Sequence, residues 1–171
     1  MYKKGVEALA EPYRTLVWRL LEELRGVFGE KLISLVVYGS VARGEAGRES
    51  DLDLLVVVEE LPRPRFARIS MFEKAEERLQ GFLSELLEKG YAVTFSPIIK
   101  TRLEAMRISP LYLDMVEDAV IVYDKDGFFE KILLKLRKRL EELGAERVRL
   151  GKKWYWRLKK DYKFGEAIVL E

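Results

Sequence analysis

Two aspartates separated by a single residue are the side chains best suited to chemistry in this sequence. Asp51 and Asp53 flank Leu52 at the start of the apolar run DLDLLVVV. Alternate residues of a β-strand project to the same face, so the two carboxylates lie roughly 6.6 Å apart along the strand and repel each other unless a cation binds there. Oxygen ligands of this kind favour Mg²⁺ or Mn²⁺. The acidic pair therefore predicts a divalent metal site, and the alternative is a solvated pair at a strand edge near a turn.

A glycine and a serine precede the acidic pair at a position that suits phosphate binding. Gly39 and Ser40 follow the apolar run LISLVVY, and ten residues separate Ser40 from Asp51. Backbone N–H groups and a serine hydroxyl there can donate to phosphate oxygens, although Ser40 also suits an ordinary helix N-cap. Arg43 is a further candidate phosphate ligand, or else a surface arginine. A phosphate pocket beside paired carboxylates is what phosphoryl or nucleotidyl transfer requires.

Composition narrows the chemistry to carboxylates. The 171-residue chain contains no cysteine and no histidine, which excludes disulfides, thiolate metal sites, the Ser-His-Asp triad and most zinc and iron sites. Its 31 basic and 29 acidic residues nearly cancel, but residues 135–163 hold twelve Lys and Arg against four Asp and Glu. This basic part favours a polyanion or an acidic protein as partner. High charge with no Asn and one Gln is typical of thermophilic proteins.

The elements that must position these residues alternate between helix and strand. Apolar residues at helical spacing predict four helices: residues 11–28, about Phe72 to Gly90, a short one from Pro110, and Asp126 to Leu143. Short apolar runs predict four strands: Leu32–Tyr38, Asp51–Val58, Tyr91–Ile99 and Ala119–Tyr123. Ser109 and Asp126 are expected to cap the last two helices. This order predicts an α/β fold with a small mixed sheet and helices mainly on one side.

The chain is expected to form one main domain with a C-terminal extension. Residues 1–125 make the domain, and residues 126–171 add a helix and a basic aromatic tail packed on it. The aromatics of the run Lys152 to Arg157 either stack on nucleic acid bases or fill a small satellite core in a hairpin. No run is long and apolar enough to span a membrane and no signal peptide is evident, so we expect a cytoplasmic protein.

The residues around the acidic pair resemble a known family. YGSVARGEA at Tyr38–Ala46 and SDLDLLV at Ser50–Val56 are similar to the minimal nucleotidyltransferases of the DNA polymerase β superfamily, several of which are antitoxins paired with a HEPN-domain toxin. The likeness is close over residues 36–58, continues loosely over residues 115–124 and does not include residues 128–171.

The resemblance implies a polymerase β-like fold and a Mg²⁺-dependent activity. A nucleoside monophosphate would pass from an NTP, with ATP as the expected donor, to a hydroxyl acceptor on a protein. Asp51 and Asp53 would be the catalytic metal ligands, and Gly39, Ser40 and Arg43 would bind the nucleotide. A HEPN-type protein is the implied partner, and self-association stays open.

The chain departs from this family at the third carboxylate. That acid normally lies on the next strand, where this sequence has Thr94, with Ser96 on the same face. It helps hold the metal that activates the incoming hydroxyl, and it can take the proton. The acids that could substitute for it are Glu104, Asp114, Glu117 and Asp118.

Three hypotheses follow from the sequence. The first is an NTP-dependent nucleotidyltransferase. The second, motivated by Thr94, is a catalytically weak, nucleotide-binding, antitoxin-like interaction protein. The third is a nucleic-acid binder that uses residues 135–163.

Overall fold

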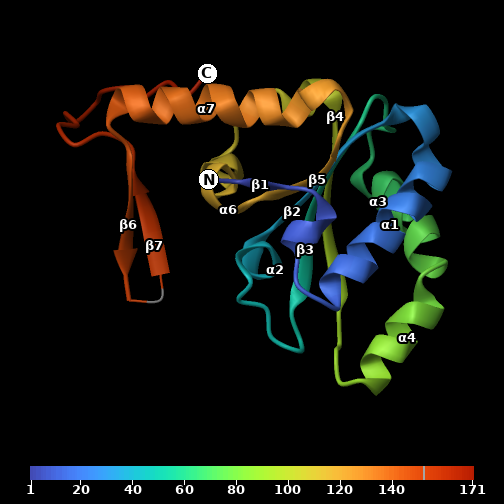
Figure 1. The fold of residues 1–171 in the computed structure, drawn as a ribbon. Helices are drawn as coiled ribbons and strands as arrows, with labels where there is room; N and C mark the ends of the chain where they lie inside the picture. Colours follow the sequence, from blue (N-terminus) through green and yellow to red (C-terminus); the bar gives the residue numbers. More distant parts are fainter. Residues whose placement is uncertain (152) are drawn as a thin grey trace.

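A five-stranded mixed sheet forms the centre of the molecule in the computed structural model, which describes residues 1–151 and 153–171 (Figure 1). The strands are β1 (Lys3–Lys4), β2 (Leu32–Tyr38), β3 (Asp51–Val58), β4 (Thr94–Thr101) and β5 (Val120–Asp124). They lie in the order β1-β5-β2-β3-β4. β3 and β4 are parallel, whereas β2 runs antiparallel to both β3 and β5. The predicted small mixed sheet is confirmed.

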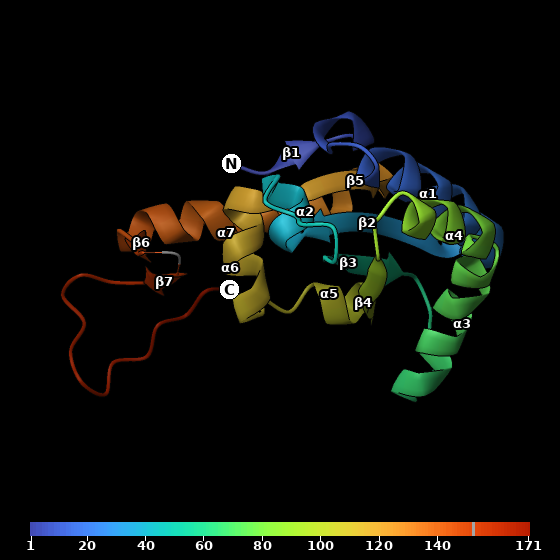
Figure 2. The same cartoon turned by 90° about the horizontal axis from the view of Figure 1, so that it is seen from below.

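Helices cover both faces of this sheet (Figure 2). One face carries α1 (Tyr13–Phe28), α3 (Arg65–Glu77) and α4 (Gln80–Glu88), and the other carries α6 (Pro110–Asp118) and α7 (Phe128–Leu143). Leu54 and Val56 of β3 belong to the first core, while Leu55 and Val57 belong to the second. Burial on both faces explains why this strand is a continuous apolar run. The α/β class is confirmed, and helices α6 and α7 add cover on the face that was expected to carry fewer helices.

A short helix and a loop connect the two central strands. Helix α2 (Gly39–Arg43) follows β2 directly, and residues 44–50 lead from it into β3. The Tyr13 hydroxyl of α1 donates to the Gly47 carbonyl at 2.8 Å, and the Gly47 N–H donates to Ser50 Oγ at 2.7 Å. Helix α1 therefore helps to fix the loop that delivers Asp51 to the start of β3.

Two predicted elements have different bounds in the structure. The predicted second helix is two helices, because the chain breaks between Glu77 and Gln80 while Leu79 stays buried within the break. Gly81, just beyond it, has a low helix propensity. Strand β4 begins at Thr94 rather than Tyr91, because the Ala92 N–H donates to the Arg48 carbonyl of the preceding loop instead of joining the sheet.

The predicted caps of the last two helices are also corrected. Ser109 has the extended backbone of an N-cap, but its side chain makes no capping hydrogen bond. Asp126 does not cap α7, because it has a φ of 54° inside the single turn η3 (Lys125–Gly127). The carboxylate of Asp124 replaces it, accepting from the N–H groups of Phe129 and Glu130, each at 2.9 Å.

The predicted hairpin is present at the C-terminal end of α7. It consists of β6 (Glu146–Leu150) and β7 (Lys153–Arg157), paired antiparallel, and Figure 1 shows it extending away from the central sheet. The remaining short elements are α5 (Arg102–Ala105), η1 (Val6–Ala8) and η2 (Gly29–Lys31). Among residues 1–151 and 153–171, no helix combines the length and apolarity needed to cross a bilayer.

Candidate active site

The acidic pair lies at the start of β3, on the open side of the strand. Leu52 between the two aspartates is completely buried, whereas Asp51 is exposed and Asp53 is half-buried. The two carboxylates therefore share one face, as the strand alternation predicted. Their neighbours on β4 are Thr94, opposite Asp51, and Ser96, opposite Asp53.

The surroundings of Asp53 disfavour its charged form. Burial raises the pKa of the Asp53 carboxyl above its ordinary value, and the charge of Asp51 raises it further. A hydrogen bond with Ser96 and the charge of Arg43 oppose this shift without cancelling it. Burial, with a smaller contribution from Asp53, also raises the pKa of Tyr38 to about 12. The two carboxylates consequently form a local excess of negative charge that a cation would relieve.

Gly39 lies so close to Asp53 that a side chain at this position would displace the Asp53 carboxylate. A Cβ atom added to Gly39 would lie 2.2 Å from Asp53 Oδ2, and the residue has a φ of 73°. Both the space and the backbone conformation therefore favour glycine over any other residue. This contact brings the Gly39-Ser40 turn, the expected phosphate-binding segment, directly beside the acidic pair.

Arg43 lies at the opposite end of α2, in a cavity of about 300 Å³. Its Nε donates to Glu45 at 2.8 Å, its Nη1 lies 3.9 Å from Asp118, and its guanidinium lies 4.7 Å from the centre of the Trp154 ring. The side chain is 22% exposed. These contacts hold the Arg43 side chain in place, on the same side of the molecule as Asp53.

Within the part of the chain that the structure describes, the four acids that could replace the missing carboxylate are bound to other groups. Within the described residues, no group of three His, Cys, Asp or Glu side chains is placed to hold a metal ion. Glu104 is bound by both Nη atoms of Arg68, and Asp114 accepts from two indole N–H groups. Asp118 pairs with Arg147, and Glu117 pairs with the N-terminal amine. Thr94 and Ser96 therefore remain the only β4 side chains beside the acidic pair in the described register.

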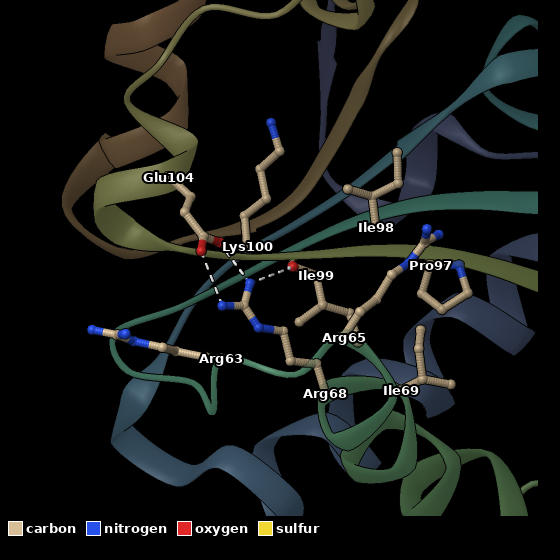
Figure 3. A pocket seen from close by; sticks show the side chains of 9 residues that line it. All are labelled: Arg63, Arg65, Arg68, Ile69, Pro97, Ile98, Ile99, Lys100 and Glu104. Carbon is tan, nitrogen blue, oxygen red and sulfur yellow. Dashed lines mark hydrogen bonds and ion pairs between the residues drawn. The ribbon is translucent and has the colours of Figure 1, made fainter.

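A second basic cavity, of about 450 Å³, lies further along β4 (Figure 3). Arg68 bridges its wall by donating to Glu104 and to the Ile99 carbonyl, while Lys100 extends away from Arg68. Burial lowers the pKa of the Lys100 amine, and Glu104 partly opposes the shift. Arg63 and Arg65 complete the basic lining. The lining of this cavity begins at Pro97, the residue after Ser96, and includes neither Asp51 nor Asp53.

The two tryptophans of the hairpin point inward. The indole N–H groups of Trp154 and Trp156 donate to Asp114 Oδ1 of α6 at 3.0 and 2.9 Å. Trp156 also packs at the margin of the apolar core beneath α6 and α7. The arrangement agrees with the satellite-core interpretation for Trp156, whereas Trp154 lines the cavity at Arg43 and Tyr155 is exposed. Lys152 of the same run lies outside the described residues.

Sequence reasoning missed the role of two arginines in this hairpin. Arg147 and Arg149 line the cavity that holds Arg43. In the sequence they count only as members of the basic stretch 135–163. Their alternation with Val148 was the available signal, because it places both on one face of a strand.

Comparisons with known proteins converge on one family. A family model described as "Nucleotidyltransferase domain" matches residues 19–112, a range that contains the acidic pair and Thr94 but ends before the hairpin. A proposed protein adenylyltransferase of Methanocaldococcus jannaschii is 29% identical over 136 residues, which cover 78% of this chain and 87% of that protein.

Solved toxin–antitoxin complexes give weaker similarities. The MntA–HepT complex matches with 14% identity and a TM-score of 0.45, covering 75% of this chain and 88% of that chain. A complex of a tri-AMPylated Shewanella oneidensis HEPN toxin with an MNT antitoxin matches with 15% identity and a TM-score of 0.41, covering 74% and 87%.

Proposed function

Because the chain belongs to the nucleotidyltransferase domain family, we propose that it transfers a nucleoside monophosphate from ATP to a hydroxyl group on a protein. The proposal depends on the contact between Gly39 and Asp53, because this contact places the glycine-serine turn and the acidic pair in a single site. The choice of ATP and of a protein acceptor is supported by the Methanocaldococcus jannaschii relative, itself a proposed protein adenylyltransferase.

The acidic pair fits a hard divalent cation. Asp51 and Asp53 present oxygen ligands on one face, and burial together with the charge of Asp51 raises the pKa of Asp53, so a bound cation would stabilise its charged form. Mg²⁺ commonly uses one or two carboxylates together with substrate phosphates and water, so two protein ligands suffice. Asp51 and Asp53 would hold Mg²⁺ or Mn²⁺. When bound, the metal would neutralise charge on the phosphates and on the attacking oxygen.

The chain's own residues would orient the triphosphate. The backbone of Gly39 and the hydroxyl of Ser40 would donate to its oxygens, holding the α-phosphorus close to the acidic pair. The acceptor oxygen then forms a bond to the α-phosphorus, while the bond from that phosphorus to the bridging oxygen breaks and pyrophosphate departs. The hydroxyl proton passes to solvent water, because neither Thr94 nor Ser96 is an effective base at neutral pH.

A second candidate function is a nucleotide-binding, antitoxin-like interaction protein with little catalysis. The observation that favours it is the absence of an acid at Thr94 and Ser96, which face the acidic pair. Such a protein would bind Mg·ATP and act through a protein partner, for which a HEPN-type protein is our proposal. Binding without transfer is the property that separates it from the first candidate.

Labelled ATP tests the two candidates directly. With Mg²⁺ and protein from the source cells as acceptor, we expect label from [α-³²P]ATP, but not from [γ-³²P]ATP, to become covalently attached to protein. The double variant Asp51→Asn/Asp53→Asn is the matched control, because it keeps the side-chain shape and removes both charges. Tight Mg·ATP binding by the wild type without any α-label transfer would favour the second candidate.

A further inference from the structure

The inner face of the C-terminal hairpin alternates arginine with tryptophan. The β6–β7 register places Arg147 opposite Trp156 and Arg149 opposite Trp154. Opposed residues of an antiparallel pair project to the same face. Lys153 belongs to the outer face with Tyr155, and both are exposed.

Two contacts fix this inner face against α6. Asp114 accepts both indole N–H groups, and Asp118 accepts from Nη1 and Nη2 of Arg147 at 3.0 and 2.6 Å. Two parallel hydrogen bonds between a guanidinium and a carboxylate fix orientation as well as distance. The hairpin is therefore held in place although its ribbon extends beyond the sheet (Figure 1).

The fixed hairpin forms one wall of the cavity that begins at Arg43. The lining residues are Arg43, Glu45, Asp118, Arg147, Arg149 and Trp154. The Trp154 ring is contacted by two guanidiniums, those of Arg43 at 4.7 Å and Arg147 at 4.1 Å from its centre. Arg43 ends the five-residue helix α2 that Gly39 begins, so it lies about 6 Å along the helix axis from the glycine that touches Asp53.

The charges in this cavity leave one arginine without an acidic partner. Arg43 pairs with Glu45, and Arg147 pairs with Asp118. Arg149 donates to the Gly151 carbonyl at 3.1 Å and makes no ion pair within residues 1–151 and 153–171. An exposed guanidinium in a cavity with two other guanidiniums suits a phosphate group, which several arginines can bind in fork-like geometry.

We propose that the hairpin completes the nucleotide site by binding the β- and γ-phosphates of the NTP through Arg149, with Arg147 and Arg43 beside it. The proposal rests on the proposed function for the position of the α-phosphate at Gly39 and Asp53. From there the polyphosphate chain reaches the cavity by following α2 for one turn. The hairpin lies outside residues 19–112, so this half of the site belongs to the chain's own C-terminal extension.

Calorimetry with three probes tests the proposal. ATP, AMP and inorganic tripolyphosphate, each with Mg²⁺, are titrated into the full-length wild type, Arg149→Ala and Lys153→Ala. The Lys153 variant is the matched control, because it removes the same charge from the outer face of the same hairpin. We expect Arg149→Ala to weaken ATP and tripolyphosphate binding by about tenfold or more, the loss of one charge-assisted hydrogen bond, and to leave AMP binding unchanged. Lys153→Ala should stay within about twofold of the wild type for all three probes.

The outcomes separate this proposal from the proposed function. Wild-type affinity of Arg149→Ala for ATP and tripolyphosphate would overturn the hairpin's role, even if Asp51→Asn/Asp53→Asn abolished metal-dependent ATP binding and so supported the acidic pair. Weakened transfer to an acidic acceptor protein with unchanged ATP binding would also overturn it, because Arg149 would then bind the acceptor. If Arg149→Ala lost tripolyphosphate binding while the wild type transferred no label, the phosphate site would be supported and the proposed function contradicted.

Discussion

Asp53 carries a charge that the folded protein does not fully compensate, and this has a pH-dependent consequence. Its folded-state pKa is raised by burial and by Asp51, so the folded state holds the proton to a higher pH than the unfolded state does. Stability from this group is therefore present at low pH and is lost as pH rises through the folded pKa. We expect metal-free Asp53→Asn to melt higher than the wild type at neutral pH, with the difference shrinking toward about pH 4.

Differential scanning calorimetry across that pH range measures this prediction. Adding Mg²⁺ should remove the wild type's deficit at neutral pH, because the cation supplies the missing compensation. The same metal should leave the variant's melting temperature nearly unchanged. A melting difference that is independent of both pH and Mg²⁺ would show that the charge of Asp53 is not the cause.

Gly39 and Gly44 form a matched pair for testing the turn. Both have a φ of 73°, but a Cβ on Gly39 would strike Asp53, whereas a Cβ on Gly44 would have nothing within 4 Å. Gly44→Ala should therefore lower the free energy of unfolding by about 1–2 kcal/mol through backbone strain alone and leave ATP binding within a few-fold.

Gly39→Ala should show the same strain and also displace the Asp53 carboxylate, so that Mg·ATP binding is lost. Urea denaturation and calorimetry on the two variants measure both effects. Equal ATP affinity in the two variants would mean that the Gly39–Asp53 contact serves the fold and not the site.

Among the elements, the register between β3 and β4 decides whether the missing acid can be restored. Thr94 is exposed and lies opposite Asp51, while its neighbour Phe95 is buried. The predicted face of Thr94 is thus confirmed, and an aspartate there would lie beside the acidic pair.

We expect Thr94→Asp to raise the rate of transfer, by as much as roughly 10²–10⁴-fold if the rest of the site is already arranged for a third acid. A single-turnover assay with labelled ATP would measure it, with Phe95 left intact so that the core is unchanged. A variant that folds, binds Mg·ATP and transfers no faster than the wild type would contradict the idea.

The attachment of the hairpin to α6 depends in part on a single carboxylate, that of Asp114. Asp114 accepts from both tryptophans, so Asp114→Leu would leave two indole N–H groups without their acceptor. We expect a loss of roughly 1–3 kcal/mol in the free energy of unfolding, together with weaker tripolyphosphate binding. Asp114→Asn keeps an acceptor oxygen and should largely rescue both properties. Equal stability in the Leu and Asn variants would show that the hairpin does not depend on this carboxylate.

Strands were easier to predict than the caps and breaks that join helices to them. Leu32–Tyr38 and Asp51–Val58 match their predicted bounds. Each strand is buried on both faces, so its sequence is a continuous apolar run that is easy to recognise. Asp126 was predicted to cap α7, but Asp124 does so. Both residues are aspartates, and only the backbone conformation shows which of them faces the N-terminus of the helix. The break at Leu79 was hidden because the apolar stripe continues across it.

At the scale of the whole molecule, the acidic pair could be predicted because its residues are close in sequence. Asp51, Asp53, Gly39 and Ser40 lie within fifteen residues, so strand alternation and one turn are enough to bring them together. The cavity at Arg43 could not be predicted in this way, because it joins α2 to a hairpin more than a hundred residues away. Asp118 of α6 lies between them, 3.9 Å from Arg43 and hydrogen-bonded to Arg147. The division at residue 125 remains a prediction, although α7 shares a core with the sheet.

Among the described residues, two cavities are each lined by three arginines, and the proposed nucleotide site extends from the acidic pair toward one of them, the cavity at Arg43. The cavity at Arg43 continues from α2, whereas the cavity at Arg68 and Lys100 lies along the free edge of β4 (Figure 3). A crystal structure with Mn²⁺ and a non-hydrolysable ATP analogue distinguishes between them, because anomalous scattering locates the metal directly. Our account predicts a Mn²⁺ peak bound by Asp51 and Asp53, with the triphosphate running along Gly39 and Ser40. A metal away from both carboxylates, or an analogue bound in the Arg68 cavity, would contradict it.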